Sequence, residues 1–229
     1  MNATESITCP VEGEKILTHY RGYYESVFII FHPFIKPKEG FEFEYENDYP
    51  DKKSIVENFD KVNWLEMLKK CGFDDLNRLD IALRNWIGGL VAKYQNRADV
   101  DRLERVCNQY KIIEPNEGRF SDSLIDEMIS SIKNLGYEKI IFGDEWGEKK
   151  EVLLIADIEF KKEDFGFSID FIPNNMYTED KKLLYSVHWD SHFTLLCSDL
   201  ETVKSIVDKC KFEGFYANNE TEIYWSVKD

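Results

Sequence analysis

The segment from His188 to Thr194 carries the side chains of this chain that are best suited to bind a metal or move protons. It reads H-W-D-S-H-F-T, so two imidazoles flank one carboxylate at every second position. In an extended strand side chains alternate, and His188, Asp190 and His192 would then point to the same face. Such a nitrogen and oxygen ligand set suits zinc, manganese or iron. A metal-dependent hydrolase or related enzyme is therefore one hypothesis for this protein.

The same segment can also be interpreted as purely structural, with no metal site and no catalytic role. Asp190 and Ser191 are residues that favour turns, and a hairpin at this point would direct the two histidines differently. The pattern H-x-D-x-H is short and is not an established metal signature by itself. We therefore favour polar groups at strand ends with ordinary hydrogen bonds. We predict no cofactor, and a divalent metal is the alternative.

A second concentration of polar and aromatic side chains is the stretch H-Y-R-G-Y-Y, residues 19–24. Arg21 between aromatic residues can hold a phosphate or a base by charge and stacking, and His19 can assist. A small-molecule pocket near Arg21 and Trp146, between helices and sheet, is a further hypothesis because pockets often form at such junctions. A packed loop rich in tyrosine explains the same residues without a ligand.

Familiar catalytic signatures are absent from the sequence. It has no G-x-S-x-G elbow, no phosphate-binding lysine loop, no dinucleotide fingerprint and no H-E-x-x-H helix. The cysteines form no C-x-x-C pair, and their odd number predicts reduced thiols. They are Cys9, Cys71, Cys107, Cys197 and Cys210. These absences weaken the enzyme hypothesis without excluding it and leave the catalytic residues unassigned.

The net charge of the 229-residue chain is −15, from 29 Lys and Arg against 44 Asp and Glu. An acidic surface repels phosphate backbones and anionic lipids, which argues against nucleic-acid and membrane partners. It favours a basic protein partner, because opposite charge speeds association. The first hypothesis is therefore a non-catalytic acidic protein-binding module, of which toxin-neutralising immunity proteins are one example.

The N-terminus has no basic start followed by an apolar stretch, so we expect no secretory signal and a cytoplasmic location. The longest apolar run lies near residues 27–31. That run is far below the ~20 residues of a membrane-spanning helix.

Hydrophobic periodicity predicts an α+β fold. Strands are expected first, at 26–31 and in the alternating stretch 41–46, followed by a helical section that begins at the capping residue Asn63. A mainly antiparallel or mixed sheet with one inserted C-terminal helix follows, because the connections between its strands are short. The expected strands of this part are 139–143, 151–160 (a central strand), 166–172, 183–189, 192–197 and 222–227. The expected helices are 63–71, 76–94, 99–110, 121–135 and one that begins after Ser198.

No linker divides the chain, so we expect one compact domain over residues 1–229. A helical lobe over 54–136 and a sheet-rich lobe over 137–229 are conceivable within it.

The stretch Y-S-V-H-W-D-S-H-F-T-L-L, residues 185–196, with a capped helix and a last strand after it, resembles a bacterial family catalogued as a domain of unknown function. The resemblance implies a bacterial cytosolic origin. It brings no assigned reaction and no catalytic residues.

Overall fold

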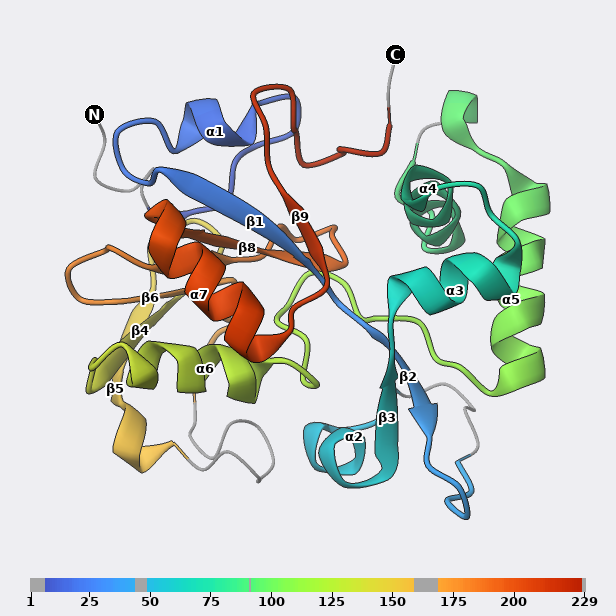
Figure 1. Ribbon diagram of the computed structural model, residues 1–229, viewed down its shortest axis with the longest axis horizontal. Coiled ribbons are helices and arrows are strands. Elements are labelled where there is room, and N and C mark those ends of the chain that lie inside the picture. Colours follow the sequence, from blue (N-terminus) through green and yellow to red (C-terminus); the bar gives the residue numbers. More distant parts are fainter. Residues whose placement is uncertain (1–6, 44–48, 91, 159–168, 228–229) are drawn as a thin grey trace.

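A seven-stranded sheet runs through the centre of the computed structural model, which describes residues 7–43, 49–90, 92–158 and 169–227 (Figure 1). Within these ranges its neighbouring strands pair antiparallel. From edge to edge the strands are β5 (Lys150–Leu154), β4 (Lys139–Gly143), β6 (Asn175–Tyr177), β7 (Leu184–Ser186), β8 (Phe193–Ser198), β1 (Ser26–Phe31) and β9 (Gly214–Tyr216).

Strand β1 shows why the sheet lies inside the molecule. Its sequence S-V-F-I-I-F is apolar on both faces, and every residue of it is buried. Because side chains alternate along a strand, Val27, Ile29 and Phe31 enter one hydrophobic core. Phe28 and Ile30 enter a second core on the opposite face. The sheet is therefore covered on both sides.

Helices close the two cores. The first core is covered by α1 (Ile16–His19), α3 (Trp64–Cys71), α4 (Leu76–Trp86) and α5 (Arg97–Tyr110). The second core is covered by α6 (Ile125–Asn134) and α7 (Leu200–Cys210), which contact each other on one face of the sheet (Figure 1). Among the described residues, no helix is both long enough and apolar enough to cross a membrane.

A smaller unit lies beside the main sheet. Strands β2 (Phe34–Pro37) and β3 (Phe59–Val62) pair antiparallel, with α2 (Lys52–Asn58) between them in the chain. Their small core contains Ile35, Ile55, Phe59 and Ile113. The sequence analysis did not predict these three elements, which are four to seven residues long.

Side-chain caps fix the beginnings of α3, α4, α5 and α7. Asn63 accepts a hydrogen bond from the Glu66 amide at 2.8 Å, as expected for the cap of α3. This helix ends at Gly72, whose φ of 63° is left-handed. For α7 the expected cap was Ser198, but Asp199 accepts the bond from the Thr202 amide instead, at 2.9 Å.

The α+β class, the mainly antiparallel sheet and the inserted C-terminal helix are confirmed. Helix α6 packs against the sheet although it lies within residues 54–136, and the division into two lobes stays a prediction. The strand predicted at 151–160 is present as β5 but ends at Leu154, and the strand predicted at 222–227 is absent. Strand β5 lies at the edge and not in the centre of the sheet, with Val152 49% exposed. Residues 222–227 form turns, and β9 provides the last strand instead.

Two further predicted strands fall only partly within the described residues. Residues 41–43 are described and are not in a strand, and Phe41 and Phe43 pack on the small core beside β3. Residues 44–46 of that prediction lie outside the described ranges, as do 166–168 of the strand predicted at 166–172, whereas residues 169–172 are described and are not in a strand.

Gly214 allows β9 to pair closely with β1. A Cβ atom at this position would overlap with the carbonyl oxygen of Ile29. We therefore expect Gly214→Ala to lower the free energy of unfolding by about 1–3 kcal/mol, the usual cost of overpacking. Urea unfolding followed by tryptophan fluorescence measures this change. Gly143→Ala is the matched control, since its Cβ would meet only ordinary contacts of 3.6 Å or more; an equal effect of both changes would contradict the explanation.

Candidate functional site

The segment that holds His188 is a hairpin connection and not one regular strand. Strands β7 and β8 pair antiparallel, and the chain turns at Trp189 and Asp190 between them. The Ser191 amide donates to the His188 carbonyl at 3.1 Å across this turn. The turn interrupts the single extended strand from which the common face of His188, Asp190 and His192 was predicted.

The turn is anchored by a close approach to residues 116–118. Gly118 donates its amide to the Ser191 carbonyl at 3.2 Å. Its φ is 69°, and a Cβ atom there would overlap with the Trp189 carbonyl oxygen. A residue with a side chain at position 118 would therefore displace the turn that carries His188.

The two histidines of this segment have different surroundings. His192 is 1% exposed, and neither ring nitrogen has a hydrogen-bond partner among the described residues. Burial and the positive charge of Arg84 lower the pKa of His192 to about 3. His188 lines a surface pocket, and the same two causes lower its pKa to about 4. Both imidazoles are neutral at pH 7.

No group of three or more His, Cys, Asp or Glu side chains in the described part of the chain is placed to hold a metal ion. Asp190, the central residue of the predicted triad, is bonded to Arg84 and Tyr224. Metal binding by His188, Asp190 and His192 stays a prediction from the sequence.

Arg84 is the centre of a buried polar network. It lies on α4 and is 0% exposed. Its Nε donates to Asp80 Oδ2 at 2.8 Å, and its Nη1 donates to Asp190 Oδ1 at 3.2 Å. Its Nη2 donates to the Ile223 carbonyl at 3.3 Å. One guanidinium therefore joins a helix, the β7–β8 turn and the C-terminal segment.

Two hydroxyl groups of the C-terminal segment take part in this network. The Tyr224 hydroxyl donates to Asp190 Oδ2 at 2.7 Å, and the Ser226 hydroxyl donates to Asp80 Oδ2. The Tyr224 ring also lies under the Arg84 guanidinium, 4.7 Å from the ring centroid. The network thereby fixes Tyr224 against the β7–β8 turn.

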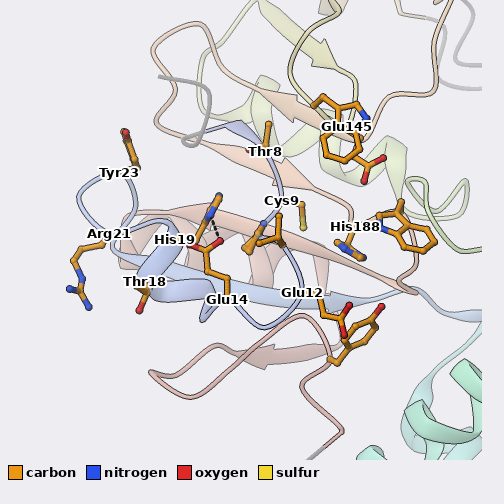
Figure 2. A pocket seen from close by; sticks show the side chains of 15 residues that line it. Thr8, Cys9, Glu12, Glu14, Thr18, His19, Arg21, Tyr23, Glu145 and His188 are labelled. Atoms are coloured by element: carbon orange, nitrogen blue, oxygen red, sulfur yellow. Dashed lines mark hydrogen bonds and ion pairs between the residues drawn. The ribbon is translucent and has the colours of Figure 1, made fainter. Parts of the chain in front are cut away.

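A pocket lies where this turn, the N-terminal segment and the loop after β4 meet (Figure 2). Its volume is about 590 Å³. It brings together four residues that the sequence analysis singled out in two separate hypotheses. These are His19, Arg21, Trp146 and His188. Asp190 and His192 do not line it.

The pocket wall is rich in acidic groups. Glu12, Glu14 and Glu145 line it, and among the described residues Arg21 is the single Lys or Arg in its lining. Figure 2 shows that the Arg21 guanidinium points away from the end of the pocket where His188 lies. Burial, followed by the neighbouring Asp144, raises the pKa of Glu145. The arrangement therefore favours a positively charged ligand.

Two tryptophans border the same pocket. Trp146 is 65% exposed and Trp189 is 57% exposed, both large values for apolar side chains. Exposed aromatic residues beside a pocket are typical of binding surfaces. Their rings can also attract a cation through their π faces.

His19 and Glu14 form a hydrogen-bonded pair in the wall. His19 Nδ1 donates to Glu14 Oε2 at 2.8 Å. The side chain of His19 is 9% exposed, and its Nε2 has no hydrogen-bond partner among the described residues. The dashed line in Figure 2 marks the pair.

The cysteine in the pocket is not an activated nucleophile. Cys9 lines the cavity, but burial raises the pKa of its thiol far above its ordinary value. A reactive cysteine requires a lowered pKa. The pocket therefore offers charge, aromatic surface and hydrogen-bond acceptors in place of covalent chemistry.

Sequence reasoning missed most of the carboxylates and the buried arginine. Glu12, Glu14 and Glu145 are three of 44 acidic residues, and no local pattern distinguishes them. Arg84 had a usable signal: it follows Asp80 by four residues within the apolar stripe of a helix. A charged pair on a buried face indicates an internal polar network.

Comparisons with known proteins give a family without an activity. A family model described as "Protein of unknown function (DUF2711)" matches residues 12–227. The chain is 22% identical over 209 residues to "Uncharacterized protein YwbB" of Bacillus subtilis (strain 168), an alignment that covers 88% of this chain and 90% of that protein. No solved structure matches the chain significantly.

Proposed function

We propose a function for this chain from the premise that it belongs to the DUF2711 family, whose description names no activity. The protein is a non-catalytic binding module that holds a basic protein partner at the acidic pocket between its N-terminal segment and the β7–β8 turn. The observation that carries this proposal is the pair of exposed tryptophans, Trp146 and Trp189, beside three carboxylates.

Charge supports this proposal at long range. The chain carries a net charge of −15, which attracts a basic protein and repels nucleic acids and anionic membranes. Such steering raises the association rate and makes it sensitive to salt. The charge also resembles in kind that of immunity proteins, which bind cationic toxins.

The tryptophans support it at short range. Side chains that dominate the energy of protein interfaces are enriched in Trp, Tyr and Arg and lie in pockets that become dry on binding. Trp146 and Trp189 each expose a large apolar surface at the rim of a cavity. A partner that covers them gains hydrophobic energy in addition to the electrostatic attraction.

The alternatives have less support. A metal-dependent enzyme built on His188, Asp190 and His192 lacks a metal-binding group among the described residues. A stoichiometric metal ion in the purified protein that is lost in the His188→Ala variant would support the metal-dependent enzyme. A small-molecule site in the pocket would bind its ligand there without retaining a basic protein.

Partner capture tests the proposal. The immobilised protein is exposed to a bacterial cell extract at low and high salt, and the retained protein is identified, purified and titrated back by calorimetry. We expect a basic protein that binds with 1:1 stoichiometry and weakens as salt increases. Trp146→Ala combined with Trp189→Ala should weaken binding at least ~30-fold, as loss of interface hot spots does.

A control variant separates the pocket from exposed apolar surface in general. Leu65 and Ile172 are 51% and 66% exposed and do not line the pocket. Leu65→Ala combined with Ile172→Ala should leave the affinity unchanged. Equal affinities of both double variants, or retention of acidic proteins only, would overturn the proposal.

A further inference from the structure

We propose that the outer part of the β2–β3 unit is a hinged arm, which two lysine–carboxylate ion pairs hold closed over a second cleft. The arm comprises residues 35–43 and 49–61 and carries α2 at its far end (Figure 1). This inference goes beyond the proposed function, because the cleft is separate from the acidic pocket.

The cleft lies between the arm and helices α6 and α7, and its volume is about 540 Å³. Ile55, Phe59 and Lys61 line it from the arm. Glu127 of α6 and Cys210 at the end of α7 line it from the opposite side. Among the described residues, none lines both this cleft and the acidic pocket. The arm and the helix pair therefore form the two walls of one cavity.

The hinge lies where the β2–β3 ribbon passes from one hydrophobic core to another. Phe34 of β2 and Val62 of β3 are paired, and both belong to the first core of the main sheet. Ile35, the next residue outward, belongs to the small core. From this point the described part of the ribbon has two strands, with a single bridge from Ile35 to Ile113. A two-stranded ribbon has little stability of its own, so the arm bends most easily here.

Ion pairs join the arm to the first turn of α6. Lys52 Nζ donates to Asp126 Oδ1 at 2.7 Å, and Lys61 Nζ donates to Glu127 Oε1 at 2.5 Å. The Lys52 side chain is 3% exposed, and lysine is seldom buried unless it is paired. The Lys61 and Glu127 side chains are 43% and 39% exposed, so water screens their pair. The pair of Lys52 and Asp126 is therefore the stronger of the two.

The contacts of the arm explain why it opens without unfolding. Its elements α2, β2 and β3 pack mainly against one another. Ile35, Ile55 and Phe59 stay together in the small core when the arm moves, so opening does not take that core apart. Water can replace an ion pair because it solvates both separated charges. Opening therefore costs less free energy than global unfolding, as is usual for a unit with few apolar contacts to the rest of the fold.

Cys210 provides a natural reporter for this opening. It is half-buried in the cleft wall, and its Sγ donates to the Glu127 carbonyl at 3.8 Å. Burial raises the pKa of this thiol, and a thiol with a raised pKa reacts slowly with alkylating reagents. An open arm admits water and reagent to Cys210. Cys197 in β8 is 0% exposed and becomes accessible only when the sheet unfolds.

Alkylation of the Lys52→Met variant tests the hinge. Wild type and variant are treated with iodoacetamide at pH 8, and mass spectrometry follows the modification of each cysteine separately. We expect Cys210 to react at least ~5-fold faster in Lys52→Met, because the partner that holds α2 to α6 is lost. The ratio of the Cys210 rate to the Cys197 rate should rise by a similar factor, which distinguishes opening of the arm from global unfolding.

Lys139→Met is the matched control for the loss of a lysine. Lys139 pairs with Glu179 at 3.5 Å on the surface and does not line the cleft. Lys139→Met should therefore leave the alkylation rate of Cys210 unchanged.

Asp126→Asn keeps the test valid if Lys52→Met does not fold. Asparagine can still accept the hydrogen bond from Lys52, but it carries no charge, so the arm should open more often than in the wild type. We expect a rise in the Cys210 rate that is smaller than in Lys52→Met. A Cys210 rate that is equal in the wild type and in these variants, or that rises only in proportion to the Cys197 rate, would overturn the inference.

Discussion

Replacing Arg84 with methionine is expected to lower the free energy of unfolding by about 3–5 kcal/mol, the usual effect of removing one partner from a buried ion pair. The change leaves Asp80, which is 0% exposed, without its 2.8 Å partner. It also removes the donor to Asp190 and to the Ile223 carbonyl. Methionine nearly fills the volume of the arginine stem, so the loss reports polar interactions. Equilibrium unfolding in urea at pH 7.5 measures it.

Arg97 provides the matched control for this change. It pairs with Asp101 at 2.8 Å, but its side chain is 77% exposed. Water screens such a pair, so Arg97→Met should cost about 0.5 kcal/mol or less. A second variant, Arg84→Met with Asp80→Asn, should be more stable than Arg84→Met alone, because it removes the uncompensated charge. Equal stabilities of Arg84→Met and Arg97→Met would show that the buried network does not stabilise the fold.

Local patterns predicted much of the fold. The run S-V-F-I-I-F and the cap at Asn63 each depend on interactions within a few residues, and both appear in the structure as expected. Local patterns did not show which strands pair with each other in the sheet. Residues 151–160 look apolar enough for a central strand, but strand β4 already pairs with β6 on its other side, which leaves β5 at the edge.

The candidate site was less predictable for the same reason. His19, Trp146 and His188 were noticed individually because of their side-chain chemistry, and only the folded chain shows that they line one cavity. A turn at Asp190 and Ser191 was one of two interpretations of the segment, and local sequence did not decide between them; the structure has the turn at Trp189 and Asp190. Arg84 and Gly118, which come from distant parts of the chain, donate hydrogen bonds to this segment and stabilise the turn.

Acidification should destabilise the protein between pH 7 and pH 5 through three buried histidines. Burial lowers the pKa of His32 and of His192 to about 3, and that of His188 to about 4. In the unfolded chain a histidine has its ordinary pKa of about 6.5. Below pH 6.5 the unfolded state therefore binds more protons than the native state, and the free energy of unfolding falls as pH decreases.

The expected size of this effect is large. At pH 5 each of the three histidines contributes a loss of about 2 kcal/mol, or about 6 kcal/mol together, relative to pH 8. Asp190 acts in the opposite direction, because burial raises its pKa and the native state gains a proton there on acidification. The ordinary pKa of this carboxyl, 3.8, lies well below that of histidine. Asp190 therefore offsets the loss of stability only at the acidic end of the pH range.

Urea unfolding at pH 8, 6.5 and 5 measures how the free energy of unfolding changes with pH. The variant His188→Gln shows how much of this change comes from His188. Glutamine cannot take up a proton, so this variant should lose less stability than the wild type between pH 8 and pH 5, by about 2 kcal/mol. His188 is the preferred position because it lies in the pocket wall, where replacement disturbs the core least. A wild-type stability that is equal at pH 8 and pH 5 would mean that these imidazoles already accept protons in the native state. A slope unchanged by His188→Gln would assign the acid sensitivity to His32 and His192.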